Sequence, residues 1–277
     1  MKFYWVFLVG LITCMICMSS CKADKVIQSD NNLEEIYPEQ TKDKYWIFLL
    51  AGQSNMAGRA AVEAEDWNDN SHILTVNEQG DWIVAQEPLH FYEPAYAGLD
   101  CGLSFAQEVI LEKPDSFHIV LIPCAVGGTT IEQWLGDSLC RGVKLLSNFK
   151  QQVKHAQSLG TIKGVLWHQG ENNANQQGVQ SYLSNLINLV DTFRNITKVK
   201  NLPLFIGTLG SFAKDAETQM YWNKLNEEML KLVEQRKEVY VIQTAELTDK
   251  GDHLHFDSNS QRLLGKKFAH VVNLFVH

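Results

Sequence analysis

Short apolar runs alternate with amphipathic segments along most of this chain of 277 residues. A run that is apolar at nearly every position is typical of a strand buried on both faces of a sheet. Segments in which apolar residues recur every three or four positions are typical of helices that cover such a sheet. The alternation therefore predicts an α/β fold with a parallel sheet and covering helices.

The strongest apolar runs predict strands at residues 46–51, 118–123, 164–168, 204–209 and 239–243. Helical periodicity predicts helices at residues 103–112, 143–158, 181–193 and 220–236. A last helix follows Asp257, because Ser258 and Gln261 have the spacing of a capping box. The inward stripe predicted for this helix is Leu264, Phe268, Val271 and Phe275.

Residues 60–102 follow no clear period. Two short strands are predicted there, at 73–76 and 82–84, on either side of a turn. Aromatic residues in this segment either wall a substrate cleft or pack beneath a long loop; they are Trp67, Trp82, Phe91, Tyr92 and Tyr96.

The first residues have the pattern of an export signal. Lys2 is followed by a mostly apolar stretch and then by small residues before Cys21, which is typical of a secretory leader. The small residues before the cysteine resemble a bacterial lipoprotein signal, in which the chain is cut before the cysteine and lipid is attached to it. We therefore expect a leader at 1–20, a polar tether at 21–44 and one domain at 45–277, exported and anchored to a bacterial membrane through Cys21. The alternative is ordinary secretion.

The formal net charge of −8 makes the chain acidic. This charge argues against nucleic acid or an anionic membrane surface as a main partner. Once the leader is removed and Cys21 carries lipid, the remaining cysteines are Cys101, Cys124 and Cys140. They do not make a disulfide framework, although a single bridge, for instance between Cys101 and Cys140, can form in an oxidising compartment. The remaining cysteines contain no Cys-x-x-Cys pair, which argues against a zinc ribbon.

Ser54 lies in the sequence Gly-Gln-Ser-Asn-Met, directly behind the first predicted strand. A strand that ends there and continues into a helix presents the hydroxyl at the edge of a parallel sheet where ligands gather. Unpaired N–H groups at the helix start are suited to hold the negative oxygen of a tetrahedral intermediate. The alternative is that Ser54 only caps the helix.

A serine nucleophile needs a base, and His255 is the candidate. Asp252 precedes it by three positions, so its carboxylate can fold back onto the imidazole and fix its tautomer. His253 is a rival base, but it is adjacent to Asp252 and should point elsewhere. A zinc site made of these residues and Asp257 is the alternative. The donors follow one another too closely to converge without strain, so no metal is expected.

Two further segments follow predicted strands. Gly127 and Gly128 can bring backbone N–H groups close to a substrate; the alternative is a simple tight turn. After the third strand, Gln169 can donate a side-chain N–H to an oxyanion. Glu171 is either structural or a second acid near His255, and His168 is expected to pack against the strand end.

Together, Gly-Gln-Ser-Asn-Met, Gly-Gly-Thr, His-Gln-Gly-Glu and Asp-x-x-His resemble, in this order, the SGNH hydrolase superfamily. More narrowly, they are similar to the sialate O-acetylesterase and acetylxylan-esterase-like carbohydrate esterases. The resemblance covers roughly Tyr45 to the C-terminus. It implies a flavodoxin-like three-layer α/β/α sandwich and the hydrolysis of acetyl esters on sugars, without metal or other cofactor.

The resemblance also implies a role for each matching residue. Ser54 is the nucleophile and first oxyanion donor, His255 the base and Asp252 its partner. The second oxyanion donor is one glycine of the pair, Gly127 or Gly128. The third is Gln169, which stands where many SGNH enzymes place an asparagine. Substrate contacts are expected from the neighbouring polar side chains Gln53, Asn55, Glu171 and Asn172.

These observations favour a serine esterase that removes O-acetyl groups from carbohydrates, either sialic acid or plant-type glycans, through an acetyl-serine intermediate. Two alternatives stay open. The cleft of a surface lipoprotein can bind glycan without turnover, and a lipase or thioesterase can share the fold. The sheet edge is rich in Asn and Gln, which argues against a long acyl chain. The expected partner is therefore an acetylated saccharide.

Overall fold

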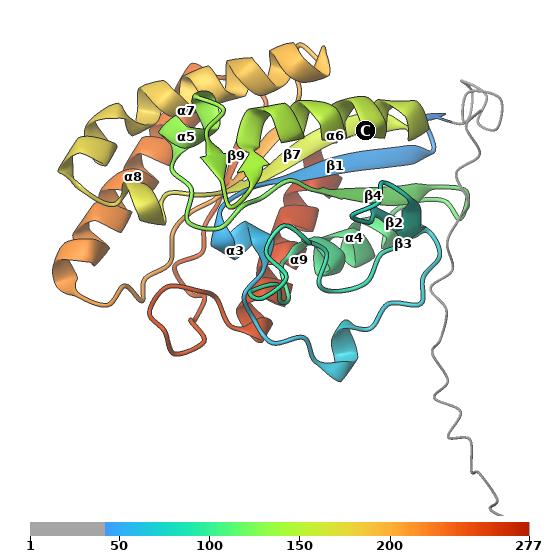
Figure 1. Cartoon of the computed structure of the whole chain (residues 1–277), viewed down its shortest axis with the longest axis horizontal. Helices are drawn as coiled ribbons and strands as arrows, with labels where there is room; N and C mark the ends of the chain where they lie inside the picture. Colours follow the sequence, from blue (N-terminus) through green and yellow to red (C-terminus); the bar gives the residue numbers. More distant parts are fainter. Residues whose placement is uncertain (1–41, 277) are drawn as a thin grey trace, which may run out of the picture.

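The computed structural model describes residues 42–276. A seven-stranded sheet runs through its centre in the order β3-β2-β4-β1-β7-β8-β9 (Figure 1). Its strands are β1 (Tyr45–Gly52), β2 (Ile73–Val76), β3 (Trp82–Val84), β4 (His118–Pro123), β7 (Thr161–His168), β8 (Leu204–Gly207) and β9 (Val239–Ile242). Neighbouring strands are parallel except at the edge, where β3 runs antiparallel to β2. All seven predicted strands are present.

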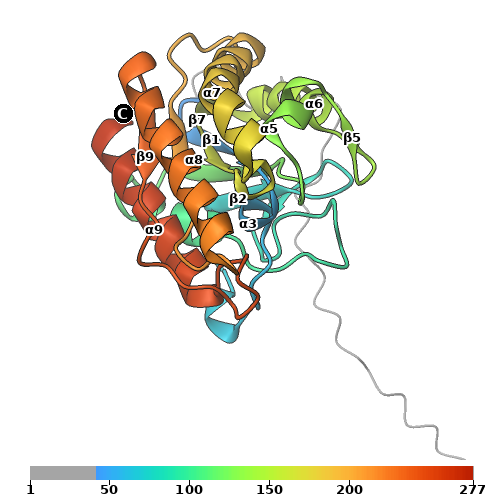
Figure 2. The ribbon, with the colours of Figure 1, turned by 90° about the vertical axis from the view of Figure 1, so that its left-hand side faces the viewer.

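Helices cover both faces of this sheet (Figures 1 and 2). One face carries α4 (Gly102–Leu111) and α9 (Ser258–Phe275), which pack on each other. The other face carries α5 (Ile131–Leu135), α6 (Leu145–Leu159), α7 (Gln176–Thr197) and α8 (Ala216–Gln235). A separate apolar cluster fills the space between the sheet and each helical layer. The predicted three-layer α/β/α sandwich with a parallel sheet is thus confirmed.

Two helices begin earlier than the apolar period predicts, because polar caps start them. The side chain of Asn175 accepts the N–H of Gly178, so α7 begins five residues before its predicted start. Asp215 accepts the N–H of Thr218 in the same way and starts α8. Caps satisfy N–H groups that lack intrahelical partners, and they extend a helix beyond its apolar stripe.

The last helix corrects two predictions. Its N-cap is Asp257, whose carboxylate accepts the N–H of Ser260; Ser258 is the first helical residue, so the predicted capping box is wrong. The predicted stripe is right for its first two members and wrong at its end. Phe275 is 53% exposed and stacks on Tyr240 of β9, and Val272 takes the buried position instead.

Smaller elements complete the domain: α3 (Ser54–Ala57), η1 (Ala64–Asp66), η2 (Glu171–Asn173) and a hairpin of β5 (Leu139–Cys140) and β6 (Val143–Lys144). Cys101, Cys124 and Cys140 are free thiols, so the bridge considered between Cys101 and Cys140 is not formed. Within residues 42–276, no helix is long and apolar enough to cross a membrane. The predicted leader, Cys21 and the tether up to residue 41 lie outside the described residues.

Candidate active site

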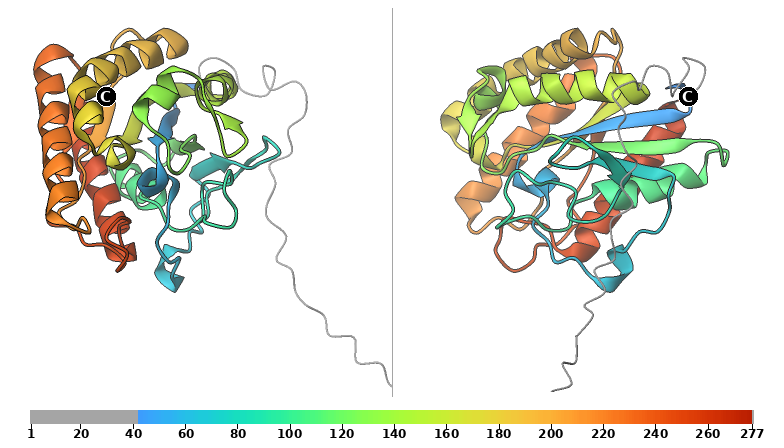
Figure 3. Two further views of the ribbon diagram at one scale, coloured as in Figure 1. Left: turned by 60° about the vertical axis from the view of Figure 1, so that its left-hand side comes forward. Right: turned by 45° about the vertical axis from the view of Figure 1, so that its right-hand side comes forward.

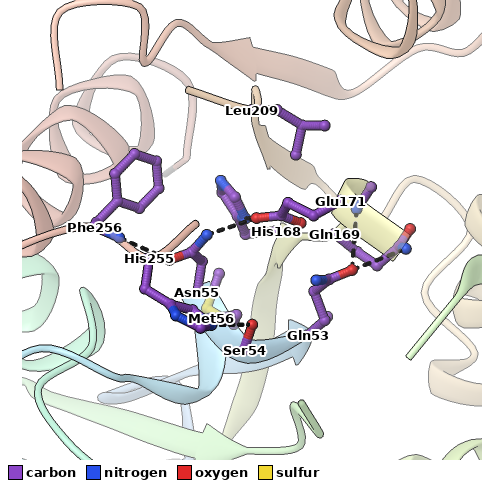
Figure 4. Close-up of polar contacts among 12 residues, drawn as sticks. Gln53, Ser54, Asn55, Met56, His168, Gln169, Glu171, Leu209, His255 and Phe256 are labelled. Atoms are coloured by element: carbon purple, nitrogen blue, oxygen red, sulfur yellow. Dashed lines mark hydrogen bonds and ion pairs between the residues drawn. The ribbon is translucent and has the colours of Figure 1, made fainter. Parts of the chain in front are cut away.

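Ser54 lies where the carboxyl end of β1 meets the end of β7. The N–H of Gln53 donates to the carbonyl of His168 at 2.9 Å and holds the two strand ends together. Gly52 has a φ of +136°, and a Cβ there would lie 2.1 Å from the same carbonyl. Only glycine fits this approach, and the chain then turns so that Ser54 begins α3 (Figure 4).

The structure brings Ser54, His255 and Asp252 into one hydrogen-bonded chain. Nε2 of His255 lies 3.0 Å from Oγ of Ser54, and its Nδ1 lies 2.8 Å from Oδ2 of Asp252. With the proton on Nδ1, the imidazole donates to the carboxylate and leaves Nε2 free to accept the serine proton. The arrangement is that of an activated serine nucleophile.

Asp252 is held as an ionised carboxylate. Burial opposes its ionisation, but the pKa is lowered overall because the carboxylate accepts hydrogen bonds from the backbone and ring of His255 and from the N–H of Leu254. The other two residues considered for a zinc site, His253 and Asp257, are not directed to a common point with them. His253 is exposed with a φ of +57°, and Asp257 caps α9. Among residues 42–276, no three His, Cys, Asp or Glu side chains are grouped to hold a metal ion.

The side chain of Asn55 connects the segment around Ser54 with the loop that carries His255. Its Oδ1 accepts the N–H of Phe256 at 3.0 Å, and its Nδ2 donates to the carbonyl of Leu254 at 3.1 Å. Both neighbours of His255 in the chain are therefore fixed by one side chain, and Figure 4 shows its bond to Phe256. Asn55 is 1% exposed. This corrects its predicted role in substrate contact: its donors and acceptor are used to position the base.

Glu171 accepts a hydrogen bond from the side chain of Asn55. Its Oε1 accepts Nδ2 of Asn55 at 2.6 Å and lies 3.7 Å from Nδ1 of His168. The His168 ring is fully buried, and burial lowers its pKa; its Nε2 lies 3.0 Å from the carbonyl of Thr208. Glu171 is thus not a substrate contact in this arrangement. It acts on the base only through Asn55, which is the structural reading of the two considered.

We expect Asn55→Ala to lower kcat about a hundredfold, because a displacement of about 1 Å in a catalytic group costs that much. It also leaves the buried N–H of Phe256 without its partner, which costs about 1–3 kcal/mol of unfolding free energy. Steady-state kinetics and thermal unfolding measure the two effects. Asn68→Ala is the matched control, because Asn68 is an equally buried side chain that bonds backbone groups elsewhere. Equal kcat values in the two variants would refute the positioning role.

Gln169 is fully occupied by other partners. Its Nε2 lies within hydrogen-bond distance of three acceptors: Asn173 Oδ1 at 2.7 Å, and Gln53 Oε1 and the Thr129 carbonyl at 3.1 Å. The hydroxyl of Tyr182 donates to its backbone carbonyl at 2.6 Å. An amide with two hydrogens and three such acceptors has none left for an oxyanion, so the predicted oxyanion role is corrected. Gln169 instead orders the loop beside the nucleophile.

Gln53 and Asn172 lie next to this loop. Oε1 of Gln53, itself 1% exposed, accepts Nε2 of Gln169 and faces the backbone N–H groups of Gly170 and Asn172 at 3.4 and 3.5 Å. Asn172 is exposed, and its Nδ2 donates to the carbonyl of Gly128 at 2.6 Å. Of the four predicted substrate contacts, Asn172 is the one whose side chain reaches solvent beside the glycine pair.

The glycine pair is fixed by a buried carboxylate that the sequence did not point to. Glu93 accepts the N–H of Gly127 at 2.5 Å, and its carboxylate pairs with Arg59 at 2.8 Å and Arg141 at 2.9 Å. Arg141 also donates from Nε to the carbonyl of Gly127 at 3.1 Å. The N–H of Gly127 is therefore not available to substrate. Gly128 follows it with a φ of +73° and is exposed.

We expect Glu93→Gln to lower the free energy of unfolding by about 3 kcal/mol, because it leaves the nearly buried guanidinium of Arg59 without a counter-charge. Thermal or urea unfolding measures this loss. Asp191→Asn is the control: it breaks a pair with Arg236 in which both side chains are substantially exposed, and such pairs contribute about 0–1 kcal/mol. Similar losses in the two variants would contradict the buried network.

Sequence reasoning missed Glu93 because its partner Gly127 lies 34 residues away and no local spacing joins them. It missed Tyr182 for a related reason: that residue was assigned to a helix, and nothing in the helix pattern shows a hydroxyl reaching Gln169. Both are buried polar groups whose partners are distant in the sequence or hidden within a helix pattern. A buried carboxylate and a buried phenol need partners, but the sequence does not say where they are.

Comparison with known proteins identifies the family of the chain. A family described as carbohydrate esterase, sialic acid-specific acetylesterase, matches residues 44–273. A probable carbohydrate esterase of Arabidopsis thaliana is 31% identical in an alignment of 242 residues that covers 80% of this chain and 88% of the relative. The X-ray structure of an Arabidopsis thaliana protein superposes with a TM-score of 0.70 at 30% identity, covering 84% of this chain and 99% of that one.

Two more distant structures share the fold. NanS has a TM-score of 0.67 at 16% identity, over 84% of this chain and 98% of that one. A carbohydrate acetylesterase from Xanthomonas citri has a TM-score of 0.63 at 22% identity, over 83% of this chain and 55% of that one. Because the family match spans nearly the whole described domain, the chain belongs to the family described as carbohydrate esterase, sialic acid-specific acetylesterase.

Proposed function

We propose that this carbohydrate esterase removes O-acetyl groups from saccharides through an acetyl-serine intermediate. The observation that carries the proposal is the unbroken chain of hydrogen bonds from Ser54 through His255 to Asp252. Membership of the family supports sugar esters as the substrate class. Asn172, which is exposed beside the glycine pair, offers a polar side chain to a sugar ester.

The reaction follows from the positions of the atoms. Nε2 of His255 takes the proton of the Ser54 hydroxyl while Oγ attacks the acetyl carbonyl carbon. The resulting imidazolium is stabilised by the carboxylate of Asp252. It then protonates the oxygen of the leaving sugar as the ester bond breaks, and Ser54 keeps the acetyl group. A water molecule, deprotonated by His255, attacks this ester; the imidazolium then returns the proton to Oγ of Ser54 as the bond breaks and acetate is released.

The negative oxygen of each tetrahedral intermediate needs donors. In our proposal these are the N–H of Ser54, at the free start of α3, and the N–H of Gly128. Gly127 is excluded because Glu93 uses its N–H, and Gln169 is excluded because its amide has other acceptors. We therefore propose Gly128 as the member of the pair that donates to the oxyanion.

The test is acetate release from a panel of acetylated saccharides: sialic acid, xylan, pectin and mannan fragments, together with p-nitrophenyl acetate. The expected result is acetate release from at least one sugar and from the chromogenic ester. Each is expected to be lost in Ser54→Ala. Octanoyl esters of the same alcohols serve as the comparison, and a preference for octanoyl over acetyl would overturn the proposal. Saccharide binding without any acetate release would overturn it as well.

A further inference from the structure

A groove of about 750 Å³ lies beside the glycine pair, and the residues that line it do not include Ser54. Its walls are the turn between β2 and β3, the segment around Phe91, the tip of the β5–β6 hairpin and one face of α6. Figure 3 shows this turn and this hairpin on neighbouring parts of the molecule. The volume falls within the range of about 300–1,000 Å³ that is usual for small-ligand sites.

Arg141 connects this groove to the catalytic centre. It lines the groove, and its Nε donates to the carbonyl of Gly127 at 3.1 Å. One residue earlier, the N–H of Val126 donates to the carbonyl of Gly52, two residues before Ser54. Arg141 thus lies between the groove and the backbone that is bonded to the nucleophile's loop.

The lining has the chemistry of a sugar site. Phe91 and Tyr92 form an aromatic pair with ring centroids 4.6 Å apart, and the Phe91 ring is partly exposed. The Tyr92 hydroxyl is fixed by the carbonyl of Pro123 and the amide of Asn148, so the pair is held in place. The apolar face of a pyranose can pack on such a ring. Exposed amide and ammonium groups at the rim, including Gln151, can bond its hydroxyls.

We infer that this groove binds the sugar units next to the acetylated one, so that the substrate is an acetylated oligosaccharide or polysaccharide and not a free monosaccharide. The inference rests on the proposed function and specifies its substrate class. Aromatic, amide and charged side chains line the groove together, a combination that suits sugar rings with their apolar faces and hydroxyl edges. Its length along α6, from Asn148 to Ser158, suits a chain of sugars that continues beyond the reacting unit.

The first experiment compares KM for acetylated oligosaccharides of four to six units with KM for the matching acetylated monosaccharide, for xylose-, mannose- and galacturonate-based series. Wild-type protein is expected to show a KM at least tenfold lower for the oligosaccharide of one series. Phe91→Ala is expected to raise that KM roughly tenfold, and Gln151→Ala severalfold. The kinetics on p-nitrophenyl acetate should not change. Lys150→Ala is the matched control, because Lys150 is exposed beside Gln151 on α6 and does not line the groove.

The second experiment separates the groove from the chemistry. Calorimetry with Ser54→Ala and the same oligosaccharides measures binding without turnover, and adding Phe91→Ala or Gln151→Ala to that variant should weaken binding. If no ester releases acetate but this binding persists, the proposed function fails and the groove stands. If acetate is released with equal KM for mono- and oligosaccharides, and neither groove variant changes it, the groove inference is refuted while the esterase stands.

Discussion

Ser54→Ala is expected to lower kcat for acetate release by about a million-fold, the scale of the loss when the nucleophile of a serine hydrolase is removed. Without the hydroxyl no acetyl-serine forms, and His255 has no proton to accept. The fold should be unaffected. Ser54 is 6% exposed, the N-cap of α3 is Gln53, and the Ser54 hydroxyl faces the imidazole. The alternative reading of Ser54 as a simple helix cap predicts a loss of stability instead.

Initial rates on p-nitrophenyl acetate and thermal unfolding of the same sample separate these readings. Ser184→Ala is the control, because Ser184 is a serine on α7 whose hydroxyl bonds only within its own helix. We expect wild-type rates from the control and background rates from Ser54→Ala, with unchanged melting temperatures in both. A Ser54→Ala protein that still turns over at the wild-type rate would exclude the acetyl-serine mechanism.

Asp252→Asn is expected to lower kcat by up to about ten-thousandfold with little change in KM. The new amide can donate to Nδ1 of His255, which favours the tautomer with the proton on Nε2. That nitrogen then faces the Ser54 hydroxyl as a donor and accepts no proton from it. The loop itself should hold, because the remaining oxygen can still accept the N–H groups of Leu254 and His255.

Asp252 is ionised over the whole pH range in which a histidine can act as a base. Its pKa lies below the ordinary value of 3.8, so it is ionised at neutral pH. The hydrogen bonds that lower this pKa stabilise the folded protein fully at pH values above the ordinary pKa of 3.8. This stabilisation is lost as the pH falls through the pKa of Asp252 in the folded protein. Activity near neutral pH is therefore not expected to report on titration of Asp252.

Asp257→Asn provides the matched control in the same loop. It alters the N-cap of α9, so we expect a modest loss of stability and a kcat within a few-fold of wild type. Kinetic constants and melting temperatures of the two variants give the comparison. If Asp252→Asn retains most of its kcat, or loses no more than Asp257→Asn, the imidazole does not depend on this carboxylate.

The sheet and its helical layers were predictable because strands buried on both faces are apolar at almost every position, whatever their partners. Residues 118–123 agree with β4 in full, and residues 46–51 agree with β1 to within one residue at each end. The position of Ser54 follows from the same pattern, because the carboxyl ends of parallel strands share one edge. The spacing of Asp252 and His255 is local, so it too was visible.

The roles of polar residues around Ser54 were decided only by the tertiary structure. Asn55 was assigned to substrate and instead holds Phe256, which is 201 residues away. Gly127 was a predicted oxyanion donor, but its N–H donates to the carboxylate of Glu93 in the structure. Each assignment depends on which partner satisfies a buried donor, and a donor is satisfied by whatever the fold brings within about 3 Å.

The chain by itself thus determined which elements form, which edge of the sheet carries the chemistry, and which serine, histidine and aspartate belong to it. These features could be predicted because the periodicity of apolar residues and the short spacing between Asp252 and His255 depend only on residues that are close in the sequence. The three-dimensional arrangement decided which amides remain free for a substrate and where a groove opens beside them. Those properties belong to residues distant in sequence, and they exist only once the sheet and its loops have packed.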